Sequence, residues 1–375
     1  MRRGLAVARS PVGVVWLIVA GPVLGAGEGY SVRQITSGPQ HHFFGYIGHA
    51  GTVPWNASGR YIVALRTRFI DKFPEPDDVA DIILLDAHRN YAARVVDQTR
   101  AWNPQQGTML YWNPQAADTQ FFFNDRDPVT GKVFAVLFDV ALGKRVREFR
   151  YGETPVGNSG VAQRGGYLLG INYGRLARLR PVTGYAEAWD WTTGFAAPTD
   201  DGIFVIDVAT GEKGLLVSYA ALRAELVAIL PHAKDTHLFI NHTLWNRDDD
   251  RIYFYVRGNF RSPLPKVDVP FTTDLQGNLQ RQMHLGGHPE WELGRTMIGS
   301  HDGRQVLYDT DRQEITGQLG SSGDFSRPGG DIALSPDGKR FVNGYSSKDP
   351  AENYDSILFR RQNRLVHTRG FSRGQ

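Results

Sequence analysis

The chain has 375 residues, no cysteine and a formal net charge of +3. Without cysteine there is no disulfide, no thiol nucleophile and no thiolate metal site. The first 26 residues contain three arginines and no acid, so the rest of the chain carries no net charge. Bulk electrostatic attraction to nucleic acid or to a membrane surface is therefore not supported.

Residues 1–26 have the layout of a signal peptide. A basic start precedes the apolar run 14–20, and small residues suitable for cleavage surround position 25. The apolar run is too short for a comfortable membrane span. We therefore predict export to the periplasm or the cell exterior, cleavage near residue 25 or 26, and a mature chain without a membrane span. Residues 27–375 show no linker and are predicted to form one domain.

One short pattern recurs along the mature chain: an apolar residue, often Trp, then a polar turn, then a strand-like run. It is clearest at Trp245, which precedes a polar turn and the run 252–257. Short strands with Asp/Gly turns, repeating at intervals in the forties, are typical of β-propeller blades. We predict an all-β propeller of four-stranded blades, most simply seven, although six or eight also fit. The repeat starts are Trp55, Trp112, Val161, Trp245, Trp291 and Leu334.

In chain order, residues 30–37 are expected to form a strand that completes the last blade. Residues 82–86 and 93–97 are expected to be the outer strands of the first blade. Residues 128–132 form a hairpin turn of the second blade, because Pro and Gly lie between strand-like runs.

The unit between Val161 and Trp245 is unusually long. Residues 220–230 have apolar residues at helical spacing and end at Pro231, which predicts an inserted helix. The insertion explains the length, and a degenerate blade hidden in the same span is the alternative.

The residue three places before each repeat start has an equivalent position in every blade. In a propeller the first strand of each blade lines the central channel, so these side chains are expected to lie near the axis. His242, His288 and Asp331 would then converge. The six residues are Thr52, Met109, Asn158, His242, His288 and Asp331.

His242, His288 and Asp331 are the candidate metal ligands. Imidazole together with carboxylate suits Mn, Zn, Fe or Ni, and three protein ligands leave a position open for substrate. A divalent metal, Mn, Zn or Ca, is therefore the candidate cofactor. The alternative is that the three side chains cap strands by hydrogen bonding to neighbouring backbone.

Strand geometry links further residues to this cluster. The residue entering the first strand of a blade and the residue leaving the second lie at the same end. The expected neighbours are His242 with Arg257, His288 with His301, Asp331 with Tyr345, and Asn158 with Tyr173 and Arg175. These residues predict a pocket of imidazoles, a carboxylate, arginines and tyrosines at one mouth.

The arginines of this pocket are candidates for binding a carboxylate or sulfate through paired hydrogen bonds. They are Arg257, Arg175, Arg178 and Arg180. For the last two, salt bridges on a loop are an equally good explanation.

Aromatic and further histidine residues have two interpretations each. Tyr173 and Tyr185 are candidates for proton transfer or for stacking on a sugar, and packing is the alternative. His41, His42 and His49 precede the first repeat, where a structural role is favoured over a second metal site.

Several segments resemble exported propeller polysaccharide lyases of the ulvan lyase type. They are HHFFGY at 41–46 with Pro54-Trp55, QQGTML at 105–110, NYGRL at 172–176 with Arg180-Pro181, and DDGI at 200–203. Oligogalacturonate lyases are a more distant resemblance. His242 in NHTLW and His288 in GHPEW resemble metal-binding histidines of that family, whereas Asp331 stands where the family has histidine.

The resemblance implies β-elimination on a glycan that contains uronate. A cation neutralises the uronate carboxylate, a base removes the C5 proton, and an acid protonates the departing O4. The resemblance to ulvan lyases implies that His and Tyr transfer protons and that Arg neutralises charge. Arg257 and Tyr173 are the best matches to that Arg and that Tyr. His242 is the candidate base if no metal is bound, and Tyr173 or Arg175 if His242 is a ligand.

Three hypotheses about function follow from these observations. The chain is predicted to be a carbon–oxygen lyase acting on an acidic polysaccharide or oligosaccharide, with Asn158, Arg178, Tyr185 and His301 as substrate-binding residues. The alternative is a non-catalytic exported propeller that binds a protein or glycan at the same mouth. A hydrolase is disfavoured because no pair of carboxylates occupies the channel positions.

Overall fold

The computed structural model describes residues 33–45, 53–321, 323–325, 327–346, 352–359 and 364–372. Some predicted features lie outside these residues: the signal peptide, His49, Thr52 and the side chain of Tyr345. Within the described ranges, no helix has both the length and the apolar character that a membrane span needs.

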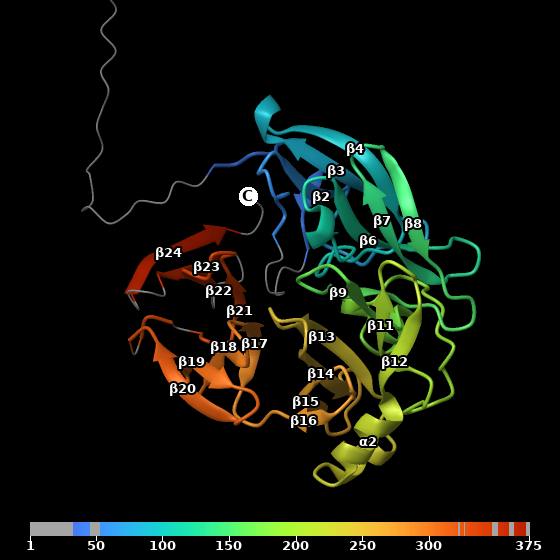
Figure 1. The fold of residues 1–375 in the computed structure, drawn as a ribbon, viewed down its shortest axis with the longest axis vertical. Coiled ribbons are helices and arrows are strands. Elements are labelled where there is room, and N and C mark those ends of the chain that lie inside the picture. Colours follow the sequence, from blue (N-terminus) through green and yellow to red (C-terminus); the bar gives the residue numbers. More distant parts are fainter. Residues whose placement is uncertain are drawn as a thin grey trace, which may run out of the picture. The chain divides into compact units, whose positions relative to one another are not determined.

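The described chain is built from four-stranded antiparallel sheets that follow one another in sequence order (Figure 1). The first sheet contains β1 (His41–Phe43), β2 (Tyr61–Thr67), β3 (Ala80–Asp86) and β4 (Ala92–Thr99). The second contains β5 (Tyr111–Trp112), β6 (Gln120–Arg126), β7 (Val133–Asp139) and β8 (Lys144–Phe149). The third contains β9 (Gly157–Val161), β10 (Tyr167–Ile171), β11 (Gly202–Asp207) and β12 (Lys213–Ser218).

The remaining strands repeat this arrangement. The fourth sheet contains β13 (Phe239–Trp245), β14 (Ile252–Gly258), β15 (Val267–Thr273) and β16 (Leu279–Arg281). The fifth unit contains β17 (Gly286–Trp291), β18 (Thr296–His301), β19 (Arg304–Asp309) and β20 (Glu314–Leu319). The sixth contains β21 (Asp331–Leu334), β22 (Arg340–Ser346), β23 (Glu352–Phe359) and β24 (Arg364–Ser372). A parallel contact between β17 and β21 joins the last two units.

The described residues thus form six four-stranded units, one fewer than the seven that the repeat favoured. The long span after Val161 contains helices and loops between and after the strands of the third sheet, and no additional sheet appears among its residues. The described part of the predicted strand at 30–37 is also not a strand. Instead, Ile35 packs against Ile62 and Ile83 of the first sheet.

Alternating side chains explain how neighbouring sheets pack. Phe121 and Phe123 of β6 pack in one core cluster with residues of the first sheet, whereas Phe122 packs in another with residues of the third sheet. Successive side chains of a strand point to opposite faces. Both faces of β6 are therefore buried, which is why three consecutive phenylalanines follow one another in this strand instead of alternating with polar residues.

The helices are short. α2 (Tyr219–Val227) confirms the predicted inserted helix, and the Ser218 hydroxyl caps it by accepting from the Ala221 amide at 3.1 Å. α1 (Tyr173–Leu179) was not predicted, and the Asn172 side chain caps it. The 3-10 helices are η1 (Ala87–Arg89), η2 (Pro114–Ala116), η3 (Pro181–Thr183) and η4 (Pro231–Lys234).

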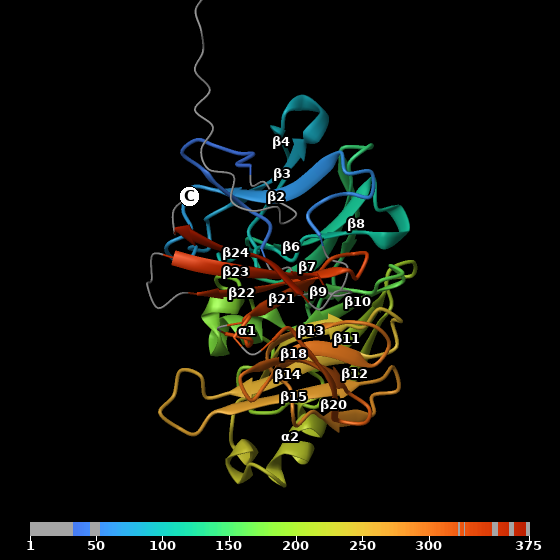
Figure 2. The same cartoon turned by 90° about the vertical axis from the view of Figure 1, so that its left-hand side faces the viewer.

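First strands of successive sheets lie side by side. β9 contacts β13, β13 contacts β17, and β17 contacts β21 (Figure 1). The helix α1 also contacts β13 (Figure 2). This arrangement brings together residues that are separated by up to about one hundred positions in the chain, and it creates the site described next.

Candidate functional site

His242 lies on an irregular part of β13. The pairing of β13 with β14 shifts between Asn241 and Leu244, and His242 there has a φ of +55°. Met109, at the equivalent repeat position, has a φ of +56°. Non-glycine residues with positive φ are uncommon and gather at functional sites. The local bulge therefore gives the repeat position an orientation that an ordinary strand residue would not have.

The two histidines and the aspartate come together as the repeat predicted. The ring centroids of His242 and His288 are 5.0 Å apart. His288 pairs with Asp331 across the parallel β17–β21 contact, and its Nδ1 lies 3.3 Å from Asp331 Oδ1. His242 is buried, whereas the side chains of His288 and Asp331 are 38% and 69% exposed. A solute can therefore reach the His288–Asp331 pair.

The contact between His288 and Asp331 has a chemical consequence. A carboxylate that lies 3.3 Å from Nδ1 favours the imidazole tautomer that carries its proton on Nδ1 and leaves Nε2 unprotonated. No described residue makes a hydrogen bond to Nε2 of His288. Such an imidazole can act as a general base toward a bound molecule.

The donor types in this cluster suit a divalent metal, but their arrangement does not. Within the described residues, no group of three His, Asp or Glu side chains is placed to hold a metal ion. His288 Nδ1 faces Asp331, and the ring of His242 faces the ring of His288. The three side chains form a row of pairwise contacts and do not surround one point.

Tyr255 and Arg257 extend the row along β14. The ring of Tyr255 lies 5.9 Å from that of His242, and the Arg257 guanidinium lies 4.2 Å from the Tyr255 ring centroid. The cross-strand partner of Arg257 is Phe239, so Tyr255 stands between the predicted neighbours His242 and Arg257. Sequence reasoning missed Tyr255, although its position two residues before Arg257 places it on the same face of the strand.

Hydrogen bonds hold both of these side chains in place. Arg257 donates to the Asn241 side chain at 3.0 Å and makes an ion pair with Asp268 at 2.7 Å. The Tyr255 hydroxyl donates to the Gly287 carbonyl at 2.9 Å, next to His288. Burial raises the pKa of Tyr255, so this hydroxyl stays protonated at neutral pH.

Comparison with known proteins identifies the architecture. No protein-family profile matches the sequence, and no curated protein sequence does. A solved oligogalacturonate lyase in complex with manganese superposes with a TM-score of 0.54 and 15% identity, covering 87% of this chain and 77% of that one. The chain has a β-propeller fold. A hydrazine synthase structure from Kuenenia stuttgartiensis has a TM-score of 0.45 and 10% identity, covering 85% and 82%.

At such identity the likeness shows the fold alone. It supports the propeller part of the predicted resemblance and does not test the ulvan lyase type.

Three other predicted site residues are buried inside the propeller. Tyr173 and Tyr185 stack with ring centroids 4.4 Å apart, and the Tyr173 hydroxyl donates to the Asn158 carbonyl at 3.0 Å. Asn124 binds both Tyr185 and the Asn158 backbone. Burial raises the pKa of both tyrosines far above the usual range. This network ties β6 to β9, so these residues pack the propeller and do not face a bound substrate.

Arg175 is also part of the core. It is fully buried, and its guanidinium donates to the backbone carbonyls of Leu238, Phe195 and Ala196 and to the Thr192 hydroxyl. Four of its five N–H groups therefore donate to the protein itself. The structure places it outside the set of side chains that can reach a substrate.

The remaining predicted residues lie at the surface. Arg178 makes an ion pair with Asp190 at 2.9 Å and approaches His237 Nδ1 at 3.4 Å. His301 does not join His288, because its ring contacts His284 at a centroid distance of 5.6 Å, and its Nε2 lies 3.4 Å from Asp302. Arg178 also lines a cavity.

Proposed function

We propose that this protein is an exported lyase that cleaves uronate-containing acidic glycans by β-elimination. The observation that carries the proposal is the row of Arg257, Tyr255, His242, His288 and Asp331 on four neighbouring strands. It supplies a cation, a protonated hydroxyl and an oriented imidazole within one site. Those are the groups that removal of a weakly acidic proton beside a carboxylate requires.

Each residue has a role in the proposed reaction. Arg257 neutralises the uronate carboxylate, so that negative charge can build up as the C5 proton leaves. Nε2 of His288 takes that proton, and Asp331 holds the imidazole in position. The Tyr255 hydroxyl protonates the departing O4, and its raised pKa keeps the proton available. The His242 ring packs beside the rings of Tyr255 and His288.

A divalent metal has no step in this mechanism. The fold neighbour was solved with manganese, and Mn, Zn or Ca was the predicted cofactor. The described His and Asp donors do not surround one point, so they do not fit a three-ligand centre. Arg257 takes the part that a metal would play in neutralising the carboxylate.

The test is the appearance of the unsaturated product, followed by its ultraviolet absorbance, with ulvan, pectate or a glycosaminoglycan as substrate. We expect a rise with at least one polymer and none with His288→Ala. His284→Ala is the matched control, because His284 lies on the surface beside His301 and outside the row. No rise with any uronate polymer would refute the proposal.

A non-catalytic glycan-binding propeller is the second candidate. The observation in its favour is that Arg257 and the Tyr255 hydroxyl already have protein partners, Asp268 and Gly287. A substrate would have to displace both. Binding of a uronate polymer without unsaturated product, unchanged in His288→Ala, would select this function.

A further inference from the structure

A second cavity lies beside α1, away from the row of His242, His288 and Asp331. It has a volume of about 580 Å³ and is lined by the turn between β6 and β7, by α1 and by the loop that follows α1. Its chemistry comes from Arg126, Arg178, Glu187, Trp189 and Asp190. A cavity of this size accommodates one or two sugar rings.

The cavity is held in shape by close backbone packing. A Cβ atom on Gly174 of α1 would lie 2.2 Å from the Trp189 carbonyl oxygen, so only glycine allows this approach. The Trp189 amide donates to the Gly131 carbonyl at 2.9 Å. These contacts fix the loop carrying Trp189 against both α1 and the β6–β7 turn.

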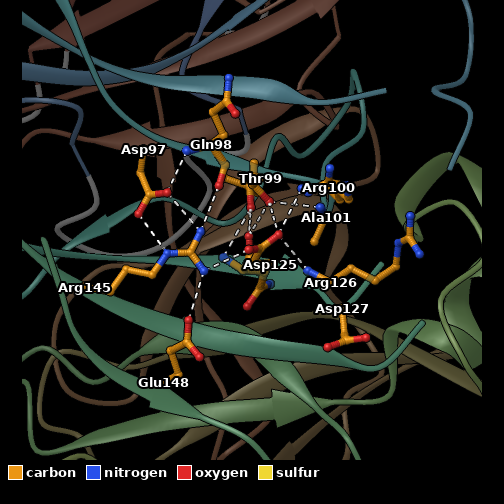
Figure 3. A network of polar contacts seen from close by, with 12 residues as sticks. Asp97, Gln98, Thr99, Arg100, Ala101, Asp125, Arg126, Asp127, Arg145 and Glu148 are labelled. Carbon is orange, nitrogen blue, oxygen red and sulfur yellow. Dashed lines mark hydrogen bonds and ion pairs between the residues drawn. The ribbon is translucent and has the colours of Figure 1, made fainter. Parts of the chain in front are cut away.

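Arg126 is a buried cation beside this cavity. The residue is 4% exposed and its Nη2 donates to the Pro76 carbonyl at 2.5 Å, but it makes no ion pair with a described residue and its Nε has no hydrogen bond. The neighbouring carboxylate of Asp125 is bound instead by Arg145, at 2.9 Å. Figure 3 shows the Arg126 side chain pointing away from that network. A buried guanidinium without a direct ion pair is stabilised when an external anion binds to it.

Arg178 and Trp189 complete the set of recognition groups. Nη2 of Arg178 is buried without a hydrogen bond, although its Nε binds Asp190. Trp189 is 37% exposed, and Lys132 lies 4.9 Å from its ring centroid. Two guanidinium groups for a carboxylate or sulfate, next to an accessible aromatic face, match the chemistry of an acidic sugar.

Two separate sets of contacts lie between α1, which lines this cavity, and the strands of the proposed catalytic row. Arg178 approaches His237, which precedes β13. Arg180 lies over the Phe260 ring at 4.8 Å, and Arg257 lies 5.5 Å from the same ring centroid. Arg180, at the end of α1, and Arg257 of the row therefore contact the same aromatic ring.

We propose that this cavity is a distal subsite for a second acidic sugar of the same glycan chain. Arg126 and Arg178 bind its carboxylate or sulfate ester, and Trp189 stacks on its ring. This inference rests on the proposed function for the identity of the glycan. It makes the protein an enzyme that engages several sugar units at once.

The test is calorimetric titration of the full-length His288→Ala protein with a hexagalacturonate, a heparin-derived hexasaccharide and neutral maltohexaose. We expect at least one acidic hexasaccharide to bind and maltohexaose not to bind. Adding Trp189→Ala should weaken that binding about tenfold, whereas adding Glu187→Gln should tighten it about threefold by removing an exposed negative charge from the cavity. Both substitutions are on the surface, so folding is expected to be retained.

Equal affinity in all three proteins, or binding of maltohexaose as tight as that of the acidic probes, would overturn the subsite. So would failure of both acidic hexasaccharides to bind. The outcome is separable from the lyase proposal. If the wild-type protein forms no unsaturated product, but Trp189→Ala and Glu187→Gln change the affinity as expected, the lyase proposal is refuted and the subsite is supported. If the wild-type protein forms the product, but neither substitution changes the affinity, the lyase proposal stands and the subsite is refuted.

Discussion

Replacing Arg175 by methionine should destabilise the fold instead of disabling a catalytic step. The guanidinium makes four hydrogen bonds within the protein, three of them to backbone carbonyls, and it lies 4.5 Å from the Tyr219 ring centroid. At about 1 kcal/mol for each hydrogen bond and about 1 kcal/mol for the cation–π contact, the loss comes to roughly 5 kcal/mol. Methionine carries no charge, so the variant does not have the desolvation cost of a buried guanidinium. This reduces the expected loss of unfolding free energy to roughly 3–5 kcal/mol.

Urea denaturation followed by tryptophan fluorescence measures this change in the free energy of unfolding. Arg94→Met is the matched control, because Arg94 is exposed on β4 and should change stability by less than about 0.5 kcal/mol. The activity of Arg175→Met should fall only as far as its folded fraction falls. A variant with wild-type stability and no activity would refute the reasoning and return Arg175 to the catalytic set.

Three further outcomes are expected. Asp331→Asn should slow unsaturated-product formation about tenfold, because the carboxylate only orients the imidazole that takes the proton. His288→Gln should slow it about a thousandfold, because it removes the base itself. Equal losses of rate in the two variants would contradict these roles. A chelator should change the rate less than about twofold, and an abolished rate restored by Mn²⁺ would show that a metal takes part. Hydrogen bonds from Arg295 lower the pKa of Asp250 from 3.8 to about 2. The stabilisation from this pair is complete above about pH 4 and is lost as the pH falls toward 2. Arg295→Gln should therefore lower the midpoint of urea unfolding near pH 6 and leave it unchanged near pH 2. An equal decrease of the midpoint at both pH values would show that loss of this ion pair is not the cause of the decrease.

The row of catalytic candidates shows how a repeat carries information about tertiary structure. His242, His288 and Asp331 occupy equivalent positions of successive units, so their convergence followed from the spacing of the starts alone. Strand alternation would also have pointed to Tyr255, because it shares a face with Arg257. What the repeat could not provide is the parallel pairing of His288 with Asp331, which places Nδ1 beside the carboxylate and is the reason why His288, instead of His242, is the proposed base.

By itself, the sequence determined the local elements: the strands and turns of the repeat, the hairpin turn at 128–132 and the inserted helix α2. Their signals are alternation, turn residues and helical spacing, all of which lie within a few positions of one another. The tertiary structure decided which polar side chains reach a ligand. Arg175 binds the Leu238 carbonyl 63 residues away, and α1 docks on β13, so Arg175 and Tyr173 became part of the core. Burial depends on which distant element covers a residue, and no local pattern records that.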